Sequence, residues 1–152
     1  MKDVTCILKL LQNNVSNYHD RRRVWTNVSN FWVIQNNRPV TERIDKINNA
    51  KKAITVRTFD FSTLYTKIPH HLLKGALEDI VDFCFDGGNS NGVYVLNGKA
   101  FWRIPKRGDY RTYTQKKVKD VLSYVIKNAY FQINNKVFQQ VIGIPMGSDP
   151  AP

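Results

Sequence analysis

One aspartate, Asp60, lies in a segment that otherwise consists mainly of β-branched and aromatic residues, ITVRTFDFSTLYTKIP from Ile54 to Pro69. A carboxylate in a half-buried strand is costly unless it is paired, hydrogen-bonded, protonated or bound to a cation. Carboxylate oxygens are ligands that Mg²⁺ prefers, and paired Mg²⁺ ions serve phosphoryl transfer by holding the attacking and leaving oxygens. Asp60 is therefore a candidate metal ligand. The alternative is a strand-end aspartate that accepts backbone N–H bonds or pairs with Arg57.

The composition favours a globular domain with one core. The chain has 152 residues, of which 42% are hydrophobic, and no apolar run approaches the ~20 residues of a membrane-spanning helix. Charged residues interrupt the first twenty positions, so we expect no secretory signal and an intracellular protein, nuclear or cytoplasmic. Two cysteines, Cys6 and Cys84, are too few for a disulfide framework, which fits a reducing compartment.

The charge of the chain points to a polyanionic partner. Twenty-three Lys and Arg against twelve Asp and Glu give a formal net charge of +11, which favours nucleic acid. The densest basic groups are Arg21–Arg23, Lys51–Lys52, Lys106–Arg107 and Lys116–Lys117. Each group taken alone is typical of a solvated face, so the expectation of a nucleic-acid partner rests on the total charge of the chain.

Hydrophobic periodicity predicts four helices. They cover residues 4–15 with an extension toward Arg23, residues 39–50, residues 70–86, and residues 118–126. Pro39 and Pro69 stand near two of the predicted starts, where proline is favoured.

Alternating and turn patterns predict the strands. Residues 54–61 form the best strand, and Val93–Ile104 reads as a hairpin around Asn97-Gly98. A second hairpin is predicted over residues 130–140 with its turn at Asn134-Asn135, and residues 106–114 are predicted to be a polar loop.

Two segments of the chain resemble conserved motifs of one enzyme family. TFDFSTLYTKIPHHLL resembles motif A of reverse transcriptases, and VFQQVIGIPMGSDPAP resembles their motif B, in the versions used by Penelope-like retroelements. FWVIQNNRPVTERIDKIN is similar to the segment that precedes motif A in the same group. The likeness covers residues 25–152.

The resemblance implies an α+β fold, a partial polymerase palm with part of the fingers, in which helices pack on a small antiparallel sheet with two hairpins. Residues 1–24 are then a basic amphipathic helix that resembles a remnant of the fingers, and residues 25–152 are the partial palm. In this family Asp60 corresponds to the first carboxylate ligand of Mg²⁺ or Mn²⁺, and the backbone carbonyl of Phe61 to a second contact.

The resemblance also implies a nucleotide pocket. Tyr65 matches the position where the family places an aromatic ring beside the sugar, where it excludes a 2′-hydroxyl. The other pocket residues are Gly143, Pro145, Met146, Gly147 and Ser148. The glycines and the proline of this loop let the backbone lie close to a nucleotide or template base. Many reverse transcriptases have Gln where this chain has Met146, and Penelope-like members also use Met at this position.

Motif C, which bears the remaining catalytic aspartates, is not found before Pro152. Asp79, Asp82 and Asp86 are expected to face solvent on a helix and not to replace it. We therefore expect a fragment of an RNA-directed DNA polymerase that is inactive by itself. Its partners would be an RNA template, a DNA primer and deoxynucleoside triphosphates, with no membrane. The oligomeric state is not predicted.

Two other hypotheses stay open. The chain could be a non-catalytic basic module that holds RNA or single strands with aromatic residues such as Trp25, Trp32, Trp102 and Tyr110. It could also fail to fold alone, because cutting a palm before motif C removes a strand pair and leaves a sheet edge open.

Overall fold

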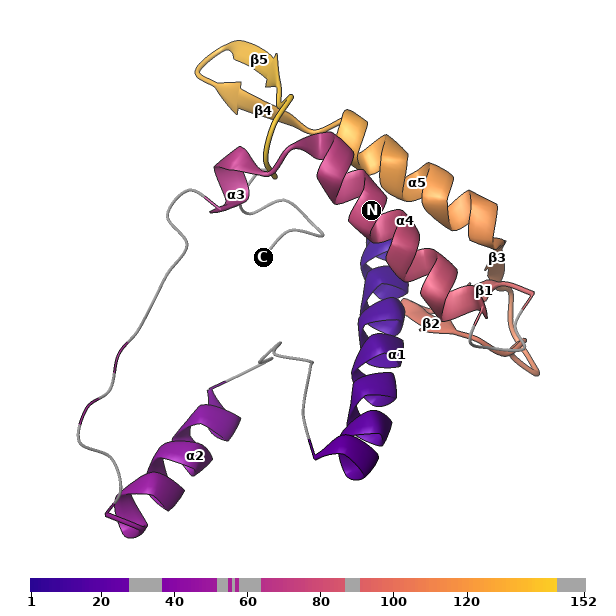
Figure 1. Ribbon diagram of the computed structural model, residues 1–152. Helices are drawn as coiled ribbons and strands as arrows, with labels where there is room; N and C mark the ends of the chain where they lie inside the picture. The colour runs from indigo at the N-terminus through magenta and orange to yellow at the C-terminus, as the bar shows by residue number, and fades with distance from the viewer. Residues whose placement is uncertain (28–36, 52–54, 56, 58–63, 87–90, 145–152) are drawn as a thin grey trace. The chain divides into compact units, whose positions relative to one another are not determined.

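The computed structural model describes residues 1–27, 37–51, 55, 57, 64–86 and 91–144 (Figure 1). These residues form helices and two small antiparallel sheets, so the predicted α+β class is confirmed. The chain divides into two compact units, of which one contains Met1–Tyr18 and Thr63–Pro152 and the other His19–Ser62. None of the described helices is long and apolar enough to cross a membrane.

The structure contains five helices in its described residues, and two of them begin near the predicted start signals. The helices are α1 (Lys2–Thr26), α2 (Arg38–Asn49), α3 (Leu64–Lys67), α4 (His70–Asp86) and α5 (Gln115–Lys127). Pro39 lies in the first turn of α2, and Pro69 immediately precedes α4. The side chain of Thr114 caps α5 by accepting a 3.3 Å hydrogen bond from the backbone N–H of Lys117. The four predicted helices are confirmed, while the short α3 is an addition.

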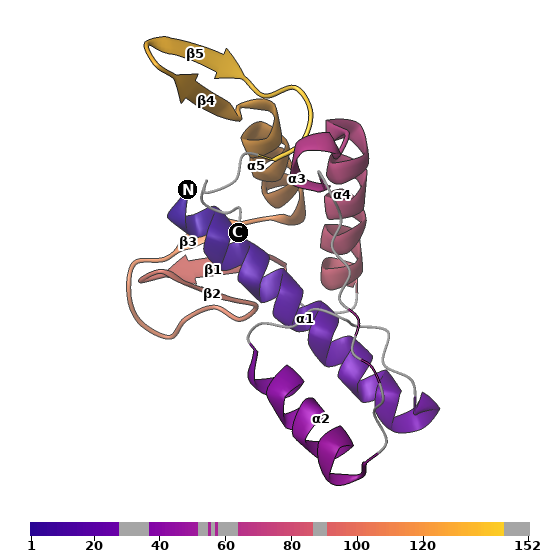
Figure 2. The same ribbon diagram turned by 90° about the vertical axis from the view of Figure 1, so that its left-hand side faces the viewer.

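The core lies between the first half of α1, α4, α5 and the strand β1 (Val93–Leu96) (Figures 1 and 2). Its buried side chains are Val4, Ile7, Leu11, Val81, Cys84, Phe85, Val93, Val95, Val118 and Leu122. Burial raises the pKa of the Cys84 thiol to about 11, so this cysteine is a neutral core residue.

The larger sheet has the strand order β2-β1-β3, and all its pairs are antiparallel. Strand β2 (Lys99–Phe101) follows β1 through Asn97 and Gly98, whose φ angles are +48° and +71°. Positive φ at both turn residues is the geometry that Asn-Gly favours, and it confirms the first hairpin. The side chains of Val93 and Val95 enter the core.

Strand β3 (Arg111–Tyr113) corrects the prediction of a polar loop over residues 106–114. Strand β3 pairs with β1. Its side chains also contact Asp3 of α1, which is far away in the sequence. A carboxylate oxygen of Asp3 lies 2.6 Å from Nη2 of Arg111, and the other accepts a 2.6 Å hydrogen bond from the Tyr113 hydroxyl. A strand of only three residues is too short to show a periodicity of its own, so contacts with the rest of the fold determine it.

The second hairpin is confirmed as β4 (Tyr130–Ile133) and β5 (Lys136–Gln139), with Asn134 at φ +53°. It follows α5, and Nε2 of Gln139 donates a 2.7 Å hydrogen bond to the carbonyl of Lys127 at the end of that helix (Figure 1). The rings of Phe131 and Phe138 stack with centroids 5.6 Å apart. The predicted strand over residues 54–61 lies outside the described residues except for residues 55 and 57.

Candidate functional site

The structure describes two of the predicted site residues. Tyr65 lies in the short helix α3, and Gly143 lies after β5. Asp60 and Phe61 fall within residues 58–63, which lie outside the described residues. The same holds for Pro145, Met146, Gly147 and Ser148, which fall within residues 145–152.

The described ends of the two motif segments meet in the fold. The backbone N–H of Gly143 donates a 2.7 Å hydrogen bond to the carbonyl of Ile68, and Pro69 forms an antiparallel bridge with Ile142. In both views the chain after β5 returns to the start of α4 (Figures 1 and 2). Residues more than seventy positions apart in the sequence are thus paired. Ile68 lies three positions after Tyr65, and Gly143 lies three positions before Met146.

A histidine that the sequence analysis did not select completes this junction. Nε2 of His70 lies 2.7 Å from the carbonyl oxygen of Gly143. Since a carbonyl oxygen only accepts hydrogen bonds, Nε2 carries the proton and donates it. His70 is the first residue of α4 and part-buried, so its ring is held between the helix start and the loop. Its place directly after Pro69 is the only sequence signal that could have drawn attention to it.

Gly143 is required at this position by its backbone conformation. Its φ of +78° lies in the left-handed region, and the residue is buried. A side chain there would strain the backbone, and both its N–H and its carbonyl are used in the junction. The role predicted for Gly143 in nucleotide binding stays a prediction, while its role in joining the segments follows from the geometry.

Within the described ranges, no three His, Cys, Asp or Glu side chains gather as a metal site. The side chain of Asp82 is 42% exposed, which agrees with the predicted solvent-facing position, and it also pairs with α5. Its carboxylate lies 2.5 Å from Nζ of Lys119 and accepts a 2.6 Å hydrogen bond from Nε2 of Gln115. The hydrogen bond from Lys119 lowers the pKa of Asp82, so the carboxylate is ionised and links α4 to α5.

Comparison of the chain with models of protein families, with curated proteins and with solved structures finds no match.

Proposed function

We propose that the chain is part of the palm of a reverse transcriptase of the Penelope-like type, an RNA-directed DNA polymerase. The observation that carries the proposal is the junction between Ile68, His70 and Gly143, because it joins the segments that resemble motifs A and B. A polymerase palm needs these segments together, since one supplies a metal ligand and the other lines the nucleotide pocket.

The roles of the residues follow from this assignment. Asp60 and the Phe61 carbonyl hold Mg²⁺ or Mn²⁺, which when bound stabilises the charge on the transferring phosphoryl group. Tyr65 borders the sugar of the deoxynucleoside triphosphate, and residues 143–148 line its pocket. His70 is a positioning residue, because it fixes the carbonyl of Gly143 at the start of that loop. The RNA template and DNA primer meet the basic surface of the chain.

Exchanging Tyr65 for valine tests the proposed sugar selection. In a polymerase that contains these residues and the family's motif C, Tyr65→Val should increase ribonucleotide incorporation relative to deoxynucleotide incorporation at least about tenfold. The reason is that valine removes the ring expected to clash with the 2′-hydroxyl. Primer extension with each nucleotide class measures the ratio.

Tyr65→Phe is the matched control, because it keeps the ring and should keep the discrimination. An unchanged ratio in Tyr65→Val would contradict the role of Tyr65. The non-catalytic alternative makes a different prediction, since a basic binding module would hold RNA equally well after Asp60→Ala and would show no Asp60-dependent synthesis.

A further inference from the structure

Residues 99–117, which run from β2 through β3 into the first turn of α5, form a strongly basic stretch. Asp109 is its only acidic residue. Its basic residues are Lys99, Arg103, Lys106, Arg107, Arg111, Lys116 and Lys117. The ratio of seven cations to one acid far exceeds that of the whole chain, where 23 basic residues face 12 acidic ones. A surface of this kind attracts a polyanion.

The loop between β2 and β3 is held against the sheet face that points away from the core. Leu96 pairs in register with Lys99, so their side chains share this face. Gly108 packs on Leu96, since a Cβ built on the glycine would lie 2.9 Å from Cδ1 of Leu96. The rings of Tyr94 and Tyr110 meet edge to face with centroids 5.5 Å apart. These contacts fix the backbone that carries the cations.

Four of these cations have no partner within the described part of the chain. The side chains of Lys99, Arg103, Lys106 and Arg107 are exposed and form no ion pair or hydrogen bond there. By contrast, Arg111 is engaged by Asp3, and Lys116 lies 3.0 Å from Asp120. The unpaired cations remain available for an external anion.

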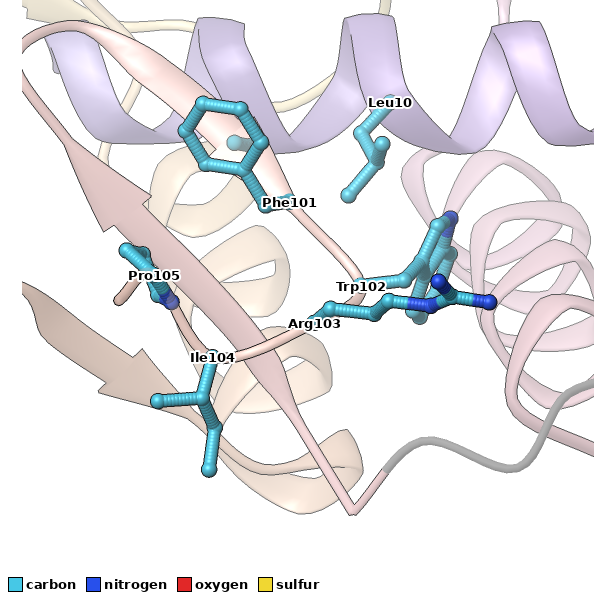
Figure 3. A pocket seen from close by; sticks show the side chains of 7 residues that line it. Leu10, Phe101, Trp102, Arg103, Ile104 and Pro105 are labelled. Atoms are coloured by element: carbon cyan, nitrogen blue, oxygen red, sulfur yellow. The ribbon is translucent and has the colours of Figure 1, made fainter.

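An apolar pocket of about 450 Å³ lies beside these cations. It is lined by Leu10, Ala100, Phe101, Trp102, Arg103, Ile104 and Pro105 (Figure 3). Trp102 is held by an edge-to-face contact with Phe85, with ring centroids 5.2 Å apart, whereas Phe101 is 40% exposed. In Figure 3 the side chains of Trp102 and Arg103 extend in the same direction, away from Ile104 and Pro105. The pocket is thus lined by the aromatic rings of Phe101 and Trp102 and by the guanidinium of Arg103.

We infer that this surface, made of Lys99, Phe101, Arg103, Lys106 and Arg107, binds single-stranded nucleic acid. The four cations contact successive phosphates, and an unpaired base enters the pocket and stacks on Phe101. A duplex offers the same phosphates but keeps its bases stacked within the helix, so the pocket favours a single strand. The inference is independent of Asp60 and of the proposed polymerase activity.

The charge component is tested with the full chain and fluorescent oligo(dT) and oligo(U) of about 12 nucleotides, by fluorescence anisotropy at several salt concentrations. The combined variant Arg103→Gln, Lys106→Gln and Arg107→Gln should weaken binding of both probes. It should also reduce the slope of log affinity against log salt by about 2, since each phosphate contact contributes about 0.7.

The matched control is Lys2→Gln, Lys127→Gln and Lys136→Gln, which removes three charges elsewhere and should retain most of the slope. Asp60→Asn should bind as the unchanged chain does, which separates this inference from the proposed polymerase. An equal loss in the two triple variants would overturn the assignment to this surface, because binding would then follow net charge alone.

The pocket is tested by Phe101→Leu, which keeps an apolar side chain and removes the ring. Single-strand affinity should fall roughly tenfold while the salt slope stays the same, because stacking is lost and the charges are retained. Affinity for a duplex of the same length should not change. Unchanged single-strand affinity, or an equal loss for the duplex, would overturn the inference. Thermal unfolding of each variant shows whether the fold is intact.

Discussion

Replacing Asp60 with asparagine is expected to lower primer extension at least about a thousandfold in a polymerase that contains these residues and the family's motif C. Asparagine keeps the shape of the side chain but removes the charge that we propose holds the divalent ion. The developing charge on the transferring phosphoryl group then loses its main stabilisation. The rate of single-nucleotide addition, at saturating primer-template, measures the effect.

Asp45→Asn is the matched control, because Asp45 is an exposed carboxylate on α2 and its loss removes the same charge. This variant should extend primers at the rate of the unchanged protein. Equal rates for Asp60→Asn and Asp45→Asn would contradict the assignment of Asp60 as a metal ligand. Binding of primer-template by Asp60→Asn should persist, since the basic surface is unchanged.

Truncation of Leu11 is expected to destabilise the chain by about 2–5 kcal/mol. Leu11 is 1% exposed and lies in the core formed by α1, α4, α5 and β1. Its replacement by alanine leaves a cavity that these well-separated segments cannot easily fill. Denaturant unfolding followed by circular dichroism gives the change in the free energy of unfolding.

Leu72→Ala makes the same chemical change on α4, at a side chain that is 60% exposed. It should alter the free energy of unfolding by no more than about 0.5 kcal/mol. If Leu11→Ala were as mild as Leu72→Ala, the first half of α1 could not be part of the core. A cooperative transition in the unchanged chain would also count against the hypothesis that it does not fold alone.

Local chemistry determined the elements that the sequence predicted well. The Asn97-Gly98 turn carries its own conformational preference, and both residues adopt the positive φ that it favours. Pro69 marks the start of α4, and the stripe of apolar residues after it faces the core through Val81 and Cys84. Each of these signals lies within a few residues of the structure that it determines.

Elements that depend on distant partners could not be predicted in this way. Strand β3 exists through its pairing with β1 and through the contacts of Arg111 and Tyr113 with Asp3, more than a hundred residues earlier. The ion pair between Asp82 and Lys119 is likewise formed only when α4 and α5 pack together. No periodicity within either segment contains this information.

The candidate site also has a part that local residues determine and a part that depends on distant partners. The local pattern singled out Asp60, and the resemblance to motifs A and B selected the segments around Asp60 and Gly143. Their junction rests on bonds that join Ile68 and His70 to a residue more than seventy positions away. His70 was missed because a histidine at a helix start has many structural roles. Its hydrogen bond to Gly143 becomes evident only in the folded chain.

The central claim is that the Asp60 and Gly143 segments form one site for a metal ion with its nucleotide. Paramagnetic broadening of amide signals in the isotope-labelled chain, on addition of Mn²⁺ and dTTP, tests this most directly. We predict that signals of both Tyr65 and Gly143 lose intensity, that Mg²⁺ in place of Mn²⁺ causes no broadening, and that Asp60→Asn abolishes the effect. Broadening at neither segment, at one alone, or to the same extent in Asp60→Asn would contradict the account.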